Sequence, residues 1–192
     1  MTTPLYPIFR KRIDDAVEQL IKGQVTPWSF LTAGPPFRIK TFDGRQIEYE
    51  GIGFEGSPSD VFWSRYIEPF LEDLCLAEIK AAVTMAKEKG VDGRLLLPEV
   101  QSLLSAGISR VFRQMAEVDR RLRGKGFPEK VELKSVDREI STMNQFLTEH
   151  IHAELAMWKP RSRVEGWYER NKFWVWVISI LLSLAGLWAK FG

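Results

Sequence analysis

One run of seventeen residues contains no charged side chain, FWVWVISILLSLAGLWA from Phe173 to Ala189. A helix that spans a bilayer needs about 17–25 mostly apolar residues, because each residue advances about 1.5 Å. Nine residues of the run are Phe, Val, Ile or Leu, and together they favour insertion by roughly 3–5 kcal/mol. The sequence therefore predicts a single transmembrane helix over about 173–190. The alternative for such a run is a fully buried core helix.

Aromatic and basic side chains flank the run in the pattern that is typical of a membrane interface. Trp and Tyr are enriched at headgroup level, and a lysine near the end of a span can extend its ammonium group into water. The sequence predicts the following interface residues: Trp167, Tyr168, Lys172, Trp174, Trp176, Trp188 and Lys190.

Three small residues lie on one face of the predicted span. Ser179, Ser183 and Gly186 are spaced at i, i+4 and i+7, and small residues allow transmembrane helices to approach closely. This spacing favours a homo-oligomer formed through the anchor. The chain has no strict G-x-x-x-G there, so a passive anchor with incidental small residues is the alternative interpretation.

Basic residues are distributed unequally around the span. Five lie in the juxtamembrane segment 159–172, and only Lys190 follows the span. Loops rich in Lys and Arg stay in the cytoplasm, so we expect the domain 1–158 to be cytosolic. The first residues, MTTPLYPIFRKRIDD, show no apolar signal peptide. The chain is therefore expected to be a single-pass, tail-anchored membrane protein.

The composition of the domain before the anchor limits its partners. Residues 1–158 carry 27 − 6 = 21 basic and 25 − 2 = 23 acidic side chains, a net charge of −2. Nucleic-acid binding needs an excess of clustered Lys and Arg, so no nucleic-acid partner is expected. The single cysteine, Cys75, lies in an apolar helical stretch and is predicted to be a buried structural thiol.

Three segments of this domain repeat apolar residues at intervals of three and four, the spacing of helices that pack side by side. Gly23 is expected to end the first helix. Ser57 and Pro58 are expected to open the next helix, and Pro69 is expected to interrupt it before a helix continues over 69–89. Trp28 and Phe30, in the stretch after the first helix, are expected to pack into the body. The predicted helices are 8–22, 69–89, 98–123 and 135–158. The principal predicted core residues are Phe9, Ile13, Val17 and Leu20; Val100, Leu104, Ile108, Val111, Met115, Val118 and Leu122; and Val136, Ile140, Met143, Leu147, Ile151, Leu155 and Trp158.

A small β-hairpin is predicted over about 37–50, around Asp43-Gly44. A three-residue loop over 43–45 would place Ile39 opposite Tyr49 and Lys40 opposite Glu48. A two-residue loop would instead mix polar and apolar residues on both faces, so cross-strand complementarity favours the first register. The predicted fold is thus mainly α, a helical bundle with one hairpin and one transmembrane helix.

The sequence shows no catalytic signature and predicts no metal site or cofactor. His150 and Glu154 share a helical face, but a zinc or di-iron site needs three or four converging ligands. His150 and His152 are about 200° apart on a helix and cannot bind one ion together. Neither a phosphate-binding glycine loop nor a nucleophile elbow is present. Four acidic residues near the hairpin are explained mostly as cross-strand partners and a helix cap: Glu48, Glu50, Glu55 and Asp60.

These features favour a non-enzymatic protein whose partners are the lipid bilayer and an unidentified protein. Its cytosolic helical domain would recruit or regulate that protein at the membrane surface. Two alternatives remain open at this point. One is a membrane-perturbing effector that oligomerises through the anchor, and the other is an enzyme that acts on a membrane-resident substrate.

Overall fold

The computed structural model describes residues 2–30, 37–40, 44–49, 66–123, 136–159, 171–174, 176–177 and 180. This part of the chain is mainly helical and forms a bundle of four long helices. The helices are α1 (Tyr6–Leu20), α4 (Glu68–Lys89), α5 (Gly93–Arg123) and α6 (Val136–Met157). A π-helical turn, η1 (Ile21–Val25), and a 3₁₀ turn, η2 (Thr26–Phe30), follow α1.

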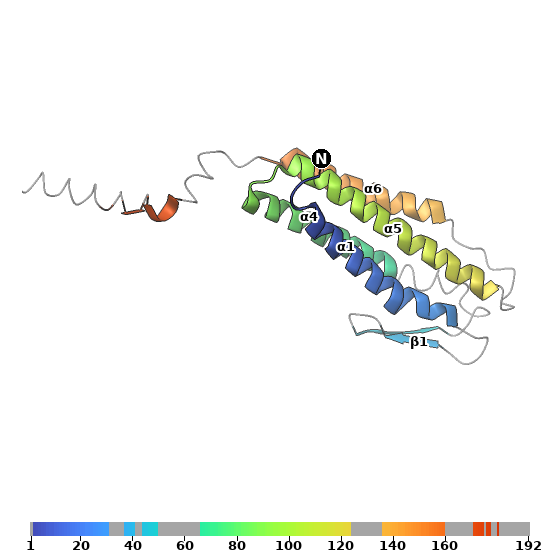
Figure 1. The fold of residues 1–192 in the computed structure, drawn as a ribbon. Helices are drawn as coiled ribbons and strands as arrows, with labels where there is room; N and C mark the ends of the chain where they lie inside the picture. The colour runs from blue at the N-terminus through green and yellow to red at the C-terminus, as the bar shows by residue number, and fades with distance from the viewer. Residues whose placement is uncertain are drawn as a thin grey trace, which may run out of the picture.

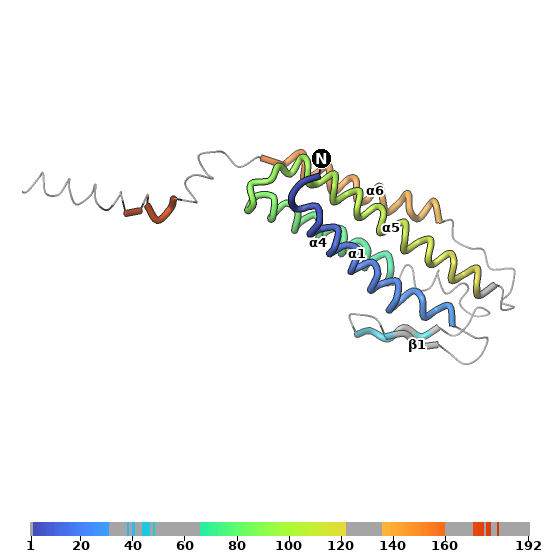
Figure 2. The backbone as a smooth tube through the Cα atoms, viewed as in Figure 1, coloured from blue at the N-terminus to red at the C-terminus, as the bar shows by residue number. Residues whose placement is uncertain are grey.

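The four helices alternate in direction along the chain. Figures 1 and 2 show α1 and α5 running one way, and α4 and α6 running back. Helix α5 packs against each of the other three, and α4 also contacts α6 and α1. This is an up-down-up-down bundle, in which the connection from α4 to α5 is a short turn and the connection from α1 to α4 contains η1, η2 and two strands.

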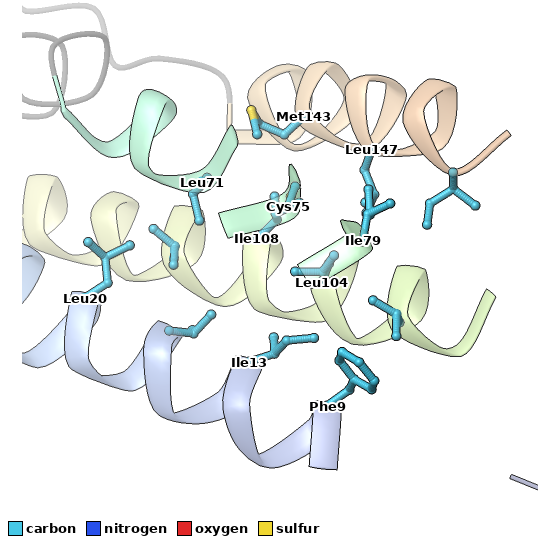
Figure 3. Packing of buried hydrophobic residues seen from close by; sticks show 14 of the residues in the cluster. Phe9, Ile13, Leu20, Leu71, Cys75, Ile79, Leu104, Ile108, Met143 and Leu147 are labelled. Carbon is cyan, nitrogen blue, oxygen red and sulfur yellow. The ribbon is translucent and has the colours of Figure 1, made fainter. Parts of the chain in front are cut away.

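The core is one continuous cluster drawn from all four helices. Figure 3 shows Phe9 and Ile13 of α1, Leu104 of α5 and Leu147 of α6 pointing into it. The predicted stripes of α1 and α5 are buried, apart from Leu122, whose side chain lies outside the described part. On α6, Met143, Leu147, Ile151 and Trp158 are buried, while Val136, Ile140 and Leu155 are partly buried against the same core.

Two expectations about the region after α1 are wrong. Gly23 does not end the helix, because glycine also adopts right-handed φ values and the chain continues through η1 with Gln24 and Val25 buried. Phe30 does not pack into the body: its side chain is 73% exposed, whereas Trp28 is buried. The 3₁₀ geometry of η2 places these two aromatic residues, two positions apart, on different sides.

The ends of α4 and α5 follow standard capping chemistry. Pro69 lies in the first turn of α4, and Gly90 ends α4 with φ +68°, a left-handed conformation that favours glycine. Helix α5 begins at Gly93, five residues before the predicted start at Pro98. The reason is Asp92, whose Oδ1 accepts a hydrogen bond from the backbone N–H of Arg94 at 2.9 Å. Pro98 is accommodated in the second turn.

Strands β1 (Phe37–Lys40) and β2 (Gln46–Tyr49) pair antiparallel within the stretch where a hairpin is predicted. The predicted register is wrong, because Ile39 pairs with Ile47 and Tyr49 pairs with Phe37. Five residues, 41–45, separate the strands instead of three, and Gly44 among them has φ +83°. The longer loop preserves the pairing of apolar with apolar positions, and Arg38 forms an ion pair with Glu48 at 2.9 Å.

Candidate membrane-facing site

The described residues at the start of the uncharged run carry exposed aromatic side chains. Residues 171–174 and 176–177 are helical, and Phe173, Trp174 and Trp176 are between 62% and 67% exposed. The rings of Phe173 and Trp174 meet edge to face, with centroids 5.7 Å apart. Lys172 beside them is also exposed. The structure thus presents three neighbouring large aromatic side chains that are mostly exposed.

The predicted site is therefore described only in part. Lys172, Trp174 and Trp176 lie in the described residues. The other predicted interface and association residues lie outside them: Trp167, Tyr168, Ser179, Ser183, Gly186, Trp188 and Lys190. Within the described ranges, no helix has the length and apolar character needed to cross a membrane.

Trp158 packs at the end of the bundle from which the chain continues toward the uncharged run. The indole is buried just beyond α6 and packs flat against Gly93 at the start of α5. A Cβ atom at Gly93 would lie 2.7 Å from two ring carbons of Trp158, so only glycine permits this approach. Lys87 of α4 lies over the same ring, with its Nζ 5.7 Å from a ring centroid. Three helices thus meet at Trp158, which is next to the predicted juxtamembrane segment.

A partly buried ion pair joins α1 to α4. Arg12 Nη2 donates a hydrogen bond to Glu78 Oε1 at 2.8 Å, and the two side chains are 46% and 7% exposed respectively. The other oxygen, Oε2, is buried without a hydrogen-bond partner in the described structure. The sequence analysis did not identify this pair, because its members are 66 residues apart and each is an ordinary surface residue type for a helix.

His150 and Cys75 have structural surroundings, whereas His152 is exposed. His150 Nδ1 lies 2.9 Å from the carbonyl oxygen of Phe146, and the two rings contact each other in a tilted arrangement, with centroids 4.2 Å apart. Across the described ranges, no three His, Cys, Asp or Glu side chains are grouped so that they could hold a metal ion. Cys75 is fully buried on α4, as predicted, and burial raises the pKa of its thiol to about 12.

The buried thiol leads to a prediction about chemical labelling. The thiolate is the reactive form, and Cys75 combines a raised pKa with no solvent access. We expect native protein at pH 8 to react with a thiol reagent such as DTNB only at the rate at which the bundle opens. Denaturant should release one reactive thiol per chain, and a single cysteine placed at exposed Phe30 serves as the fast control. Rapid native labelling of Cys75 would show that α4 opens locally.

No family model matches the chain, and neither a curated protein nor a solved structure matches it. The exposure and chemistry of its own residues are therefore the basis for assigning a function.

Proposed function

We propose that this chain is a single-pass, tail-anchored membrane protein whose cytosolic helical bundle recruits or regulates a protein partner at the membrane surface. The observation that carries the proposal is the joint exposure of Phe173, Trp174 and Trp176 at the start of an uncharged run. Burying a side chain of this size is worth about 1.5–3 kcal/mol. A contiguous exposed group of them marks an interaction with a membrane or another protein.

The continuation of the sequence favours the membrane over a protein groove. After Trp176 the run continues to Ala189 without a charge, whereas a helix that docks in a protein groove keeps a polar face. Tryptophan at the beginning of an apolar run is typical of the headgroup region. The five basic residues of 159–172, against Lys190 beyond the run, support a cytosolic bundle.

Phe30 supports the protein-binding part of the proposal. Its ring is the most exposed of the large apolar side chains in the described structure, at 73%. It is the last residue of η2, which follows α1 and η1, and Figure 1 shows α1 ending at the bundle end opposite the end of α6. Aromatic residues are enriched where protein interfaces are strongest. A partner bound there would be held by the bundle away from the bilayer.

The test of the anchor is alkaline carbonate extraction of membranes from cells that express the full chain. We expect the protein to stay in the membrane pellet, because the run contributes roughly 3–5 kcal/mol toward insertion. The double variant Ile180→Arg/Leu184→Arg places two cations near the centre of the run, each costing about 2.5–3.5 kcal/mol there. It should move to the supernatant.

The matched control adds the same charge elsewhere. Phe30→Arg/Leu76→Arg alters two side chains that are already exposed on the bundle, so this variant should remain in the pellet. Recovery of wild-type protein in the supernatant would refute the membrane anchor. Digestion of the bundle by protease from the side opposite the cytosol would refute the orientation.

A further inference from the structure

One end of the bundle combines exposed apolar and basic side chains. We call it the exit end and define it as residues 87–95 and 157–159, the turn from α4 to α5 and the end of α6. Leu95 and Met157 are 64% and 66% exposed there. Lys87, Lys89, Arg94 and Lys159 are exposed in the same two segments. With Glu88 and Asp92 counted, the exit end has a net charge of 4 − 2 = +2.

The segments of the exit end are held together as one surface. Trp158 packs on Gly93 and lies under Lys87, so the end of α6 is fixed against both α4 and α5. One carboxylate oxygen of Asp92 accepts a hydrogen bond from the backbone N–H of Arg94. Leu95 lies in the first turn of α5, two residues from Gly93, and Met157 immediately precedes Trp158. Both exposed apolar side chains are therefore within two residues, along the chain, of a member of the Trp158–Gly93 contact.

We propose that the exit end docks on an anionic lipid bilayer, with Leu95 and Met157 inserted among the headgroups and the four basic side chains near the phosphates. This inference rests on the proposed membrane anchor and adds the surface that meets the membrane. An apolar tip surrounded by Lys and Arg is the composition of interfacial membrane-binding surfaces. Juxtamembrane basic residues are attracted to anionic lipid within about a Debye length.

The short connection between the exit end and the proposed anchor allows even a weak contact with lipid to form. Thirteen residues, 160–172, connect Lys159 to Phe173 and can span at most about 45 Å when fully extended. The exit end is therefore kept close to the bilayer surface. A short connection between two binding sites raises the effective concentration of the second contact, so that a weak contact between two apolar side chains and lipid is populated. A second protein is not required to cover Leu95 and Met157.

The experiment places an environment-sensitive NBD probe on the full chain in vesicles. Three single variants carry it: Leu95→Cys and Met157→Cys at the exit end, and Phe30→Cys at the opposite end as a control of similar exposure. Cys75 is buried and its thiol pKa is about 12, and labelled wild type corrects for any reaction there. Vesicles contain phosphatidylcholine with or without phosphatidylserine, and a lipid with a nitroxide just below the headgroup quenches inserted probes.

Docking of the exit end on anionic lipid predicts a specific pattern of probe responses. We expect probes at 95 and 157 to shift to the blue and to be quenched in vesicles that contain phosphatidylserine, while the probe at 30 is unaffected. Lys89→Glu/Arg94→Glu should abolish the quenching, and Lys40→Glu/Lys80→Glu, with the same change in net charge, should not. Raising the salt to about 1 M, where the Debye length is about 3 Å, should also abolish it.

Other results overturn the proposal in distinguishable ways. Protein that fails to float with the vesicles refutes the anchor itself. Protein that floats but gives equal quenching at 95, 157 and 30 keeps the anchor and refutes docking. A blue shift at 95 and 157 without nitroxide quenching shows that a second copy of the chain covers the exit end, which also refutes lipid docking.

Discussion

Arg12→Met is expected to lower the free energy of unfolding by about 3 kcal/mol, the low end of the range for breaking a buried ion pair. The variant leaves Glu78 buried between α1 and α4 without its only ionic partner in the described structure. The low end applies because Arg12 is 46% exposed, so water can partly replace the guanidinium. Urea unfolding of the detergent-solubilised full chain, followed by circular dichroism, measures the change.

The reverse substitution gives the matched control. Glu78→Met removes the buried charge and leaves Arg12 half in water, with its guanidinium 5.7 Å from the ring of Phe9. We expect this variant, and the double variant Arg12→Met/Glu78→Met, to lie within about 1 kcal/mol of wild type, because apolar replacements of buried pairs are often neutral. Equal losses for the two single variants would mean that the carboxylate is not the vulnerable member of the pair.

Gly107→Ala is expected to destabilise the bundle by up to about 2 kcal/mol although alanine is the better helix former. A Cβ at Gly107 would lie 2.9 Å from Cγ2 of Val17, across the contact between α5 and α1. Overpacking a core costs about 1–3 kcal/mol, which outweighs the propensity gain of about 1 kcal/mol. Val17 is β-branched and has few rotamers into which it can move.

A double-mutant cycle tests the steric cause of this loss. In a Val17→Ala background the clashing methyl groups are absent, so Gly107→Ala should become stabilising by about 1 kcal/mol through helix propensity alone. Ala106→Gly, at the exposed neighbouring position, should cost about 1 kcal/mol in either background. If Gly107→Ala has the same effect with and without Val17, the close approach of α1 and α5 is not what requires glycine.

Local sequence patterns predicted the helices well, but they could not predict contacts between residues that are far apart in the sequence. The stripe of α5 could be found because burial on one face repeats with the helical period, which is a property of neighbouring residues. Gly93 and Trp158 gave no such signal, since their contact is decided by how α5 and α6 approach in space. The hairpin shows the same limit: face complementarity was the right criterion, but the loop length to which it applied was wrong.

Only part of the candidate site could be predicted from the sequence. The apolar run and its tryptophans could be recognised from composition alone, and their interface role stays a prediction. The exit end was not recognised. Leu95 precedes the predicted helix start at Pro98, and Met157 lies beside a core residue, so nothing in the pattern marked either side chain as exposed.

An even number of helices that alternate in direction returns the chain to the end where it began. Thr3 shows this directly, because its N–H and hydroxyl donate to the carboxylate of Glu99 near the start of α5, at 2.8 and 2.5 Å. The first described residues and the exit toward the anchor therefore share one end. Figure 1 shows β1 and the end of α1 toward the other end, and α5 is about 46 Å long at 1.5 Å per residue. On an anchored chain the bundle would act as a rigid spacer, and the length of α5 would set the height above the bilayer at which a partner is held.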